Sequence, residues 1–178
     1  MKKILRGLTC LLFFFLMIQI NLRAQEEGPK TGDKKFDAYL KRMNEEARAD
    51  PEGFIRRLSE RHNVPEPEIR EAREKHGLDF GETYMATVLA RRTNRSVSEI
   101  AGQYKHNKGQ GWGVMAQRLG LKPGSPEFKQ MKAEAKAQAD HFMAMNKMRK
   151  KELERDREKA KEKEKTKQKA GQPGGKKK

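Results

Sequence analysis

The sequence predicts an all-α protein: a small multi-helix domain followed by a long charged C-terminal helix and a disordered end. Two observations predict this class. Apolar residues recur at steps of three and four along most of the chain, which is the period of a helix with one buried face. No stretch combines strict apolar–polar alternation with the β-branched enrichment of a strand. A body of this length can bury one small core.

The first 24 residues have the layout of a secretory signal peptide. Basic residues at positions 2, 3 and 6 precede an apolar run over residues 8–20, and the small Ala24 stands at the expected cleavage point. The run is shorter than the ~20 residues that a membrane-spanning helix needs. We therefore expect a secreted or periplasmic protein, with an N-terminally membrane-anchored protein as the alternative. Cys10 leaves with the signal, which excludes disulfides and Cys-ligated zinc in the mature chain.

Positive charge is concentrated at the C-terminal end. The formal net charge is +16, and removal of the four basic residues in 1–24 leaves +12. Residues 147–178 hold +9 of this charge, and residues 25–146 hold only +3. We divide the mature chain into a polar lead, a helical domain and a basic charged tail, which cover residues 25–34, 35–146 and 147–178.

Three helices are expected before residue 78. Apolar side chains at steps of four, three and four predict the first, and they are Phe36, Leu40, Met43 and Ala47. Asp50 is a good N-cap residue and Pro51 suits the first helical position, so a second helix begins there. Pro65 and Pro67 open a third helix, which Gly77 ends.

Four more helices are expected after residue 78. Asp79 is the N-cap of the first, and Ser96 with Glu99 three residues later predicts a capping box at the second. The glycines at 109 and 111 separate the second helix from the third. The expected helices cover residues 80–93, 96–107, 112–120 and about 125–169.

The only Trp of the chain, Trp112, stands between Gly111 and Gly113, and its surroundings allow three interpretations. In the first, Trp112 packs in the core against the helices over 96–107 and 80–93. In the second, residues 115–121 form the first helix and turn of a helix-turn-helix-like nucleic-acid-binding protein. Pro126 stands where that motif needs an apolar residue, and the near-neutral body lacks a phosphate-binding charge.

The third interpretation makes the stretch before and around Trp112 a ligand loop. Cationic and amide side chains beside an exposed aromatic edge can hold an anionic or sugar-like group. The candidate residues are Lys105, His106, Lys108, Gln110 and Trp112.

From residue 80 to residue 128 the chain resembles a group of small exported bacterial helical proteins of unknown function. The similarity lies in residues 83–86, 95–100, 109–121 and 122–128, and it includes a G-x-G-W-G-x-[IM]-A-x-x-L-G motif. The resemblance implies an exported helical module. It carries no catalytic residue to transfer to this chain.

Catalytic and metal-binding patterns are not found. The four histidines form neither His-x-x-x-His nor His-Glu-x-x-His, and the chain has no Gly-x-Ser-x-Gly motif or phosphate loop. We therefore expect a protein that is not an enzyme and that needs no cofactor and no metal.

The tail is a candidate electrostatic arm, and a solubilising spacer is the alternative. Its basic residues are Lys150, Lys151, Arg155, Arg157, Lys159, Lys161, Lys163, Lys165, Lys167 and Lys169. No aromatic residue follows Phe142, so the tail cannot stack nucleic-acid bases. No large apolar residue follows Leu153, so it would lie on a membrane rather than insert. We expect a frayed helix that ends in a disordered segment over residues 171–178.

These observations lead to one functional expectation. The protein is an exported, non-enzymatic binding or envelope-associated module whose tail contacts anionic surfaces or acidic macromolecules. Peripheral membrane contact agrees with this, while nucleic acid is not the expected partner.

Overall fold

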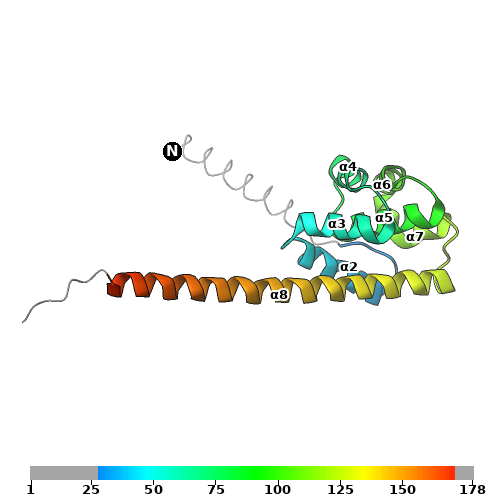
Figure 1. The fold of residues 1–178 in the computed structure, drawn as a ribbon. Helices are drawn as coiled ribbons and strands as arrows, with labels where there is room; N and C mark the ends of the chain where they lie inside the picture. The colour runs from blue at the N-terminus through cyan, green and yellow to red at the C-terminus, as the bar shows by residue number, and fades with distance from the viewer. Residues whose placement is uncertain (1–27, 171–178) are drawn as a thin grey trace, which may run out of the picture.

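The computed structural model describes residues 28–170, without side-chain detail for Lys108 and residues 167–170. The expected signal peptide and the expected disordered end lie outside the described residues. In the described part the chain is all-helical with no strand, which confirms the predicted class (Figure 1). The α-helices are α2 (Lys34–Ala47), α3 (Pro51–His62), α4 (Glu66–His76), α5 (Phe80–Thr93), α6 (Val97–His106), α7 (Gly111–Arg118) and α8 (Pro126–Ala170).

Most helix starts follow the local signals of the sequence. Asp50 accepts a hydrogen bond from the Gly53 amide at the start of α3, with a proline in the first turn. The capping box predicted at Ser96 forms only in part, because the Glu99 carboxylate accepts from Arg95 and Gln103 side chains instead. A complete capping box stands at the start of α5, where Asp79 and Glu82 cap one another.

Helix α5 is the centre of the core. Every residue from 80 to 90 is buried, because α2, α3, α4 and α6 surround the helix. Burial on all sides leaves polar side chains inside, and these need internal partners. The Thr83 hydroxyl donates to the carbonyl oxygen of the N-cap residue Asp79 at 2.6 Å, and the Thr87 hydroxyl donates to the Thr83 carbonyl oxygen at 2.8 Å. Over residues 80–90 the helix therefore has no solvent face, although its sequence carries several polar residues.

Helix α8 lies on the opposite side of the bundle from α4 and α6 and packs chiefly on α2 (Figure 1). Its buried apolar face consists of Phe128, Met131, Ala135, Ala139 and Phe142. The last contacts with the body are polar: Asn146 donates to the Glu46 carbonyl oxygen, and Arg149 donates to the Ala49 carbonyl oxygen and to Asp50. The helix crosses the predicted boundary at 146 without a break and leaves the body after Arg149.

The lead is packed rather than merely polar. Pro29 and Thr31 are buried, and the Trp112 amide donates to the Lys30 carbonyl oxygen at 2.6 Å. A Cβ atom on Gly111 would lie 2.6 Å from the Lys30 carbonyl oxygen, and one on Gly113 would lie 2.0 Å from the Thr31 carbonyl oxygen. These glycines thus admit the lead backbone to the start of α7, which explains their spacing around the tryptophan.

Candidate functional site

The tryptophan motif is a packing site. Trp112 is 0% exposed, and its ring stacks on Tyr104 of α6 with centroids 3.8 Å apart and planes at 15°. The predicted packing against the helix over 96–107 is confirmed. The ligand-loop hypothesis requires an exposed edge of Trp112, and this expectation is wrong because the side chain is fully buried. The lead is bonded to the start of α7, and Tyr104 of α6 covers the ring.

The remaining residues of the predicted ligand loop do not converge. Lys105 donates to the Lys75 carbonyl oxygen at 3.4 Å, and His106 is exposed nearby on α6. Gln110 lines a separate groove of about 320 Å³ beside the lead. The side chain of Lys108 lies outside the described residues. The loop therefore presents dispersed polar groups instead of one pocket.

The first half of helix α8 carries paired cations, whereas a helix-turn-helix needs cations that are free to contact phosphates. Lys132 is bound to Asp33 at 2.5 Å and Lys136 to Asp140 at 2.6 Å, so two cations of its first half are neutralised. The helix also packs chiefly on α2 rather than on α7, whereas the two helices of the DNA-binding motif pack on each other.

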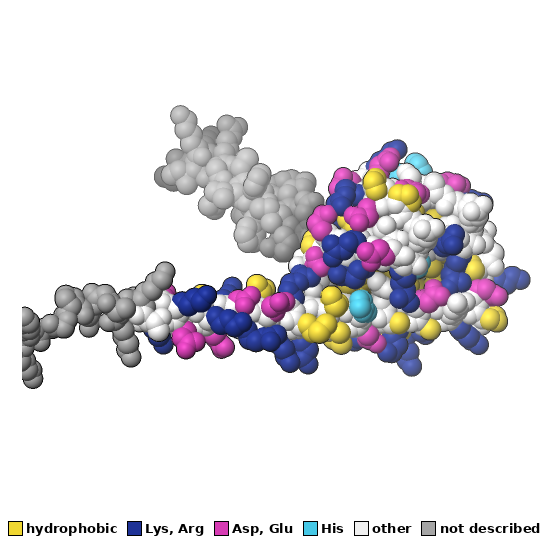
Figure 2. All heavy atoms as spheres, viewed as in Figure 1, with side chains coloured by type: hydrophobic (Ala, Val, Ile, Leu, Met, Phe, Trp, Pro, Cys, Tyr) yellow, Lys and Arg dark blue, Asp and Glu magenta, His cyan; other side chains and the backbone are white. Residues whose placement is uncertain are grey.

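The part of the tail that leaves the body is a fully exposed helix, which we call the arm (residues 151–166). Basic and acidic side chains alternate along it, as Figure 2 shows. The arm holds seven basic and six acidic residues, so it is almost balanced in charge. The basic excess lies on either side of the arm, with +3 in residues 147–150 and +5 in residues 167–178. The tail therefore consists of a nearly neutral exposed helix between two basic segments of sequence.

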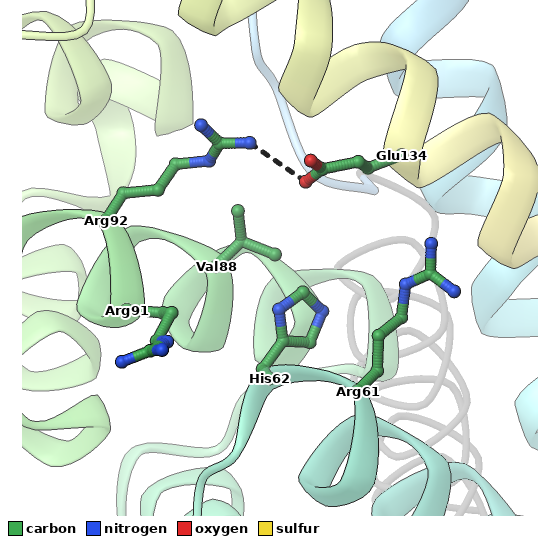
Figure 3. Close-up of a pocket in the computed structure, with 6 residues that line it drawn as sticks. All are labelled: Arg61, His62, Val88, Arg91, Arg92 and Glu134. Atoms are coloured by element: carbon green, nitrogen blue, oxygen red, sulfur yellow. Dashed lines mark hydrogen bonds and ion pairs between the residues drawn. The ribbon is translucent and has the colours of Figure 1, made fainter.

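A pocket that the sequence analysis did not identify lies between α3, α5 and α8, and we call it the arginine pocket. It encloses about 410 Å³ and is lined by Arg61, His62, Val88, Arg91, Arg92 and Glu134 (Figure 3). The ends of α3 and α5 meet here, so two basic pairs from different helices face one space. Glu134 reaches the pocket from α8 and accepts a hydrogen bond from Arg92 at 2.9 Å.

His62 is an uncharged member of the arginine pocket. Burial, helped by the nearby Arg61 cation, lowers the pKa of His62 to about 4. Its Nε2 atom is buried and has no hydrogen-bond partner, and the same holds for the hydroxyl of Tyr84, whose ring meets the His62 ring edge-on at 5.9 Å. Burial raises the pKa of Tyr84. Two neutral polar groups therefore lie beside the cations without a protein partner.

The residues that line the arginine pocket have a summed formal charge of +2, from three arginines, one carboxylate and a neutral histidine. Arg61 and Arg91 make no ion pair with any described residue, whereas Arg92 is held by Glu134. The sequence shows the basic residues of the pocket as two pairs, Arg61-His62 and Arg91-Arg92, in the last turns of α3 and α5. Cations are common there because they favour the helix C-terminus, so the signal does not indicate a pocket.

Other kinds of site receive no support from residues 28–170. No cluster of three or more metal-ligating side chains occurs among them. None of their helices is long and apolar enough to cross a membrane. Comparisons with protein-family models, with curated proteins and with solved structures give no match.

Proposed function

We propose that this protein is an exported, non-enzymatic helical module that associates with anionic surfaces of the cell envelope through the tail of α8. The observation that carries the proposal is the arm. It continues α8 beyond the last body contact at Arg149, and every side chain from 151 to 166 is exposed. A helix that buries no apolar surface adds little to folding, so its role lies in reach and charge.

The distribution of charge gives the arm and its end different roles. The arm spans about 24 Å at 1.5 Å per residue, and its balanced charge makes it a spacer. Residues 167–178 follow it with five lysines and no acidic residue. A lysine near an anionic membrane surface contributes about 1 kcal/mol, so five contribute about 5 kcal/mol at low salt. The end of the tail is thus the contact, and the arm carries it away from the body.

A vesicle-binding titration tests this proposal. Lys167, Lys169, Lys176, Lys177 and Lys178 are replaced together by Gln in the full chain. This variant should lose at least tenfold in affinity for vesicles that contain an anionic phospholipid. The affinity of the unmodified chain should fall as salt rises, because the Debye length shrinks to about 3 Å at 1 M.

The matched control removes the same charge from exposed positions on the body. It carries Gln at Lys34, Lys35, Lys41, Arg48 and Arg56. Its vesicle affinity should fall far less than that of the tail variant. Equal losses of vesicle affinity in the two variants would mean that only net charge matters. Binding to duplex DNA that does not depend on the tail lysines would favour the nucleic-acid alternative. Fractionation of native cells with N-terminal sequencing tests export, and we expect Gln25 as the first residue.

A further inference from the structure

The arginine pocket has the size and the donor chemistry of a small-molecule site. Its volume of about 410 Å³ falls within the ~300–1,000 Å³ range of ligand pockets. Guanidinium groups present planar N–H donors that match the oxygens of carboxylates and phosphates, often two at a time. Three such groups at one pocket, on a body whose net charge is only +3, are a strong local concentration of anion-binding chemistry.

The arrangement of the cations leaves binding capacity unused by the protein. Figure 3 shows the Arg61 and Arg92 side chains extending toward α8, with the His62 ring beside Arg61 and Arg91 pointing away from Glu134. Arg92 is paired with Glu134, but Arg61 has no carboxylate among the described residues. Arg61 is an exposed residue whose charge is solvated by water, so its guanidinium is open to an external anion at the pocket.

Two uncharged polar groups without hydrogen-bond partners lie beside the cations. The buried Nε2 atom of His62 and the buried Tyr84 hydroxyl both lack hydrogen-bond partners, and such atoms are rare in folded proteins. The Tyr84 hydroxyl is within electrostatic range of Arg61, Arg92 and Glu134. Both atoms are shielded from solvent, so a ligand in the pocket contacts the guanidinium groups, and the neutral His62 ring beside them adds no charge of its own.

We infer that the arginine pocket binds a small organic anion that carries two negative charges on oxygen, either in one phosphate monoester or in two carboxylates. Arg61 and Arg92 engage the oxygens from two sides, and Arg91 adds charge at the rim. Two negative charges balance the pocket's +2. Glu134 is a competitor that holds Arg92 in the empty site and must release it, at least in part, when the ligand binds. The site is distinct from the tail and needs none of its charges.

Calorimetric titration of the purified full chain tests this inference with defined probes. Glycerol phosphate represents the phosphate monoester, succinate the dicarboxylate, and glycerol the uncharged control. We expect saturable one-to-one binding of at least one anion and none of glycerol. Preference for one probe identifies the oxyanion. Failure of both anions to bind at millimolar concentration overturns the inference.

Point variants locate the binding site. Arg61→Gln should weaken the preferred probe about tenfold, which is the loss of one charged hydrogen-bonding group. Arg91→Gln should weaken it less, from its position at the rim. Arg56→Gln is the matched control, since Arg56 is an exposed arginine of the same helix that does not line the pocket. An equal effect of Arg56→Gln would show general charge attraction and overturn the assignment.

Glu134→Gln keeps the inference falsifiable even if another variant disturbs the fold. This change removes the competing carboxylate and frees Arg92, so it should tighten binding at least threefold, which damage to the fold cannot imitate. Unchanged or weaker binding by a folded Glu134→Gln chain overturns the competing role of Glu134. Replacing the five tail lysines by Gln should leave small-anion binding unchanged, so this outcome is separable from that of the vesicle experiment.

Discussion

At the scale of single residues, His62 shows how the fold changes the chemistry of a side chain. In the sequence it is a histidine at a helix end, where the positive form is favoured by the helix dipole. In the structure it is half-buried beside Arg61, and burial with this neighbouring cation lowers its pKa to about 4, so the ring is neutral at pH 7. A neutral imidazole can both donate and accept, which suits a pocket that already holds three cations.

The burial of His62 should make the free energy of unfolding depend on pH in the acid range. An unfolded chain protonates His62 near pH 6.5 and the folded chain near pH 4, so between these values the unfolded state binds more protons. The free energy of unfolding should therefore fall by about 1–2 kcal/mol as pH drops from 6.5 to 4, allowing for the ring's partial exposure. Urea unfolding of the full chain and of His62→Gln across this range measures the difference. If both chains show the same pH dependence, His62 is not the responsible group.

At the scale of elements, the start of α7 depends on a contact with the lead. The helix is short, has no side-chain N-cap bond, and begins at Gly111 with φ of +76°. The lead supplies the missing partner, because the Lys30 carbonyl oxygen accepts from the Trp112 amide. The stack of Trp112 on Tyr104 then joins α7 to α6. The glycine-rich motif is thus a junction of three segments.

Gly113→Ala should break this junction. The added methyl group would lie 2.0 Å from the Thr31 carbonyl oxygen, so either the lead or α7 must move. We expect a loss of about 1–3 kcal/mol in the free energy of unfolding, the usual cost of overpacking. Gly109→Ala is the matched control, because nothing lies within 4 Å of its Cβ position. Denaturation curves of the two variants should differ clearly, and coincident curves would mean that the lead does not dock on α7.

At the scale of the whole molecule, α8 has two parts with different physical roles. Its first half closes the core, with Phe142 stacked on Phe54 at a centroid distance of 5.1 Å. Its second half is the exposed arm, on which the last large apolar residue, Leu153, is 54% exposed. One continuous helix thus ties a packed body to a solvated extension, and the contact at Arg149 marks the change (Figure 1).

Two truncations should locate this change. Removing residues 151–178 should leave the melting temperature almost unaltered, because every side chain that the structure describes in this range, residues 151–166, is exposed. Removing residues 147–178 also takes away the bonds of Arg149 to Ala49 and Asp50, and should cost about 1 kcal/mol. Thermal unfolding of both chains beside the full chain provides the comparison. A large fall in the melting temperature on removal of residues 151–178 would mean that the arm packs on the body.

The helices and most of their limits could be predicted from the sequence. The all-α class, the Asp50 and Asp79 caps, the apolar face of α2 and the unbroken run of α8 depend on residues within a few positions of one another. The burial of Trp112 followed from its helical neighbours in the same way. The arm's exposure was predictable too, because charged residues without apolar neighbours cannot form a core.

The tertiary structure alone decided what meets across the chain. The docking of Lys30 on Trp112, the point at which α8 leaves the body, and the arginine pocket all join residues far apart in sequence. Arg61, Arg92 and Glu134 each look like an ordinary surface charge on its own helix. Only the packing of α3, α5 and α8 brings them to one cavity, because the crossing of helices depends on the whole packed core rather than on a local pattern.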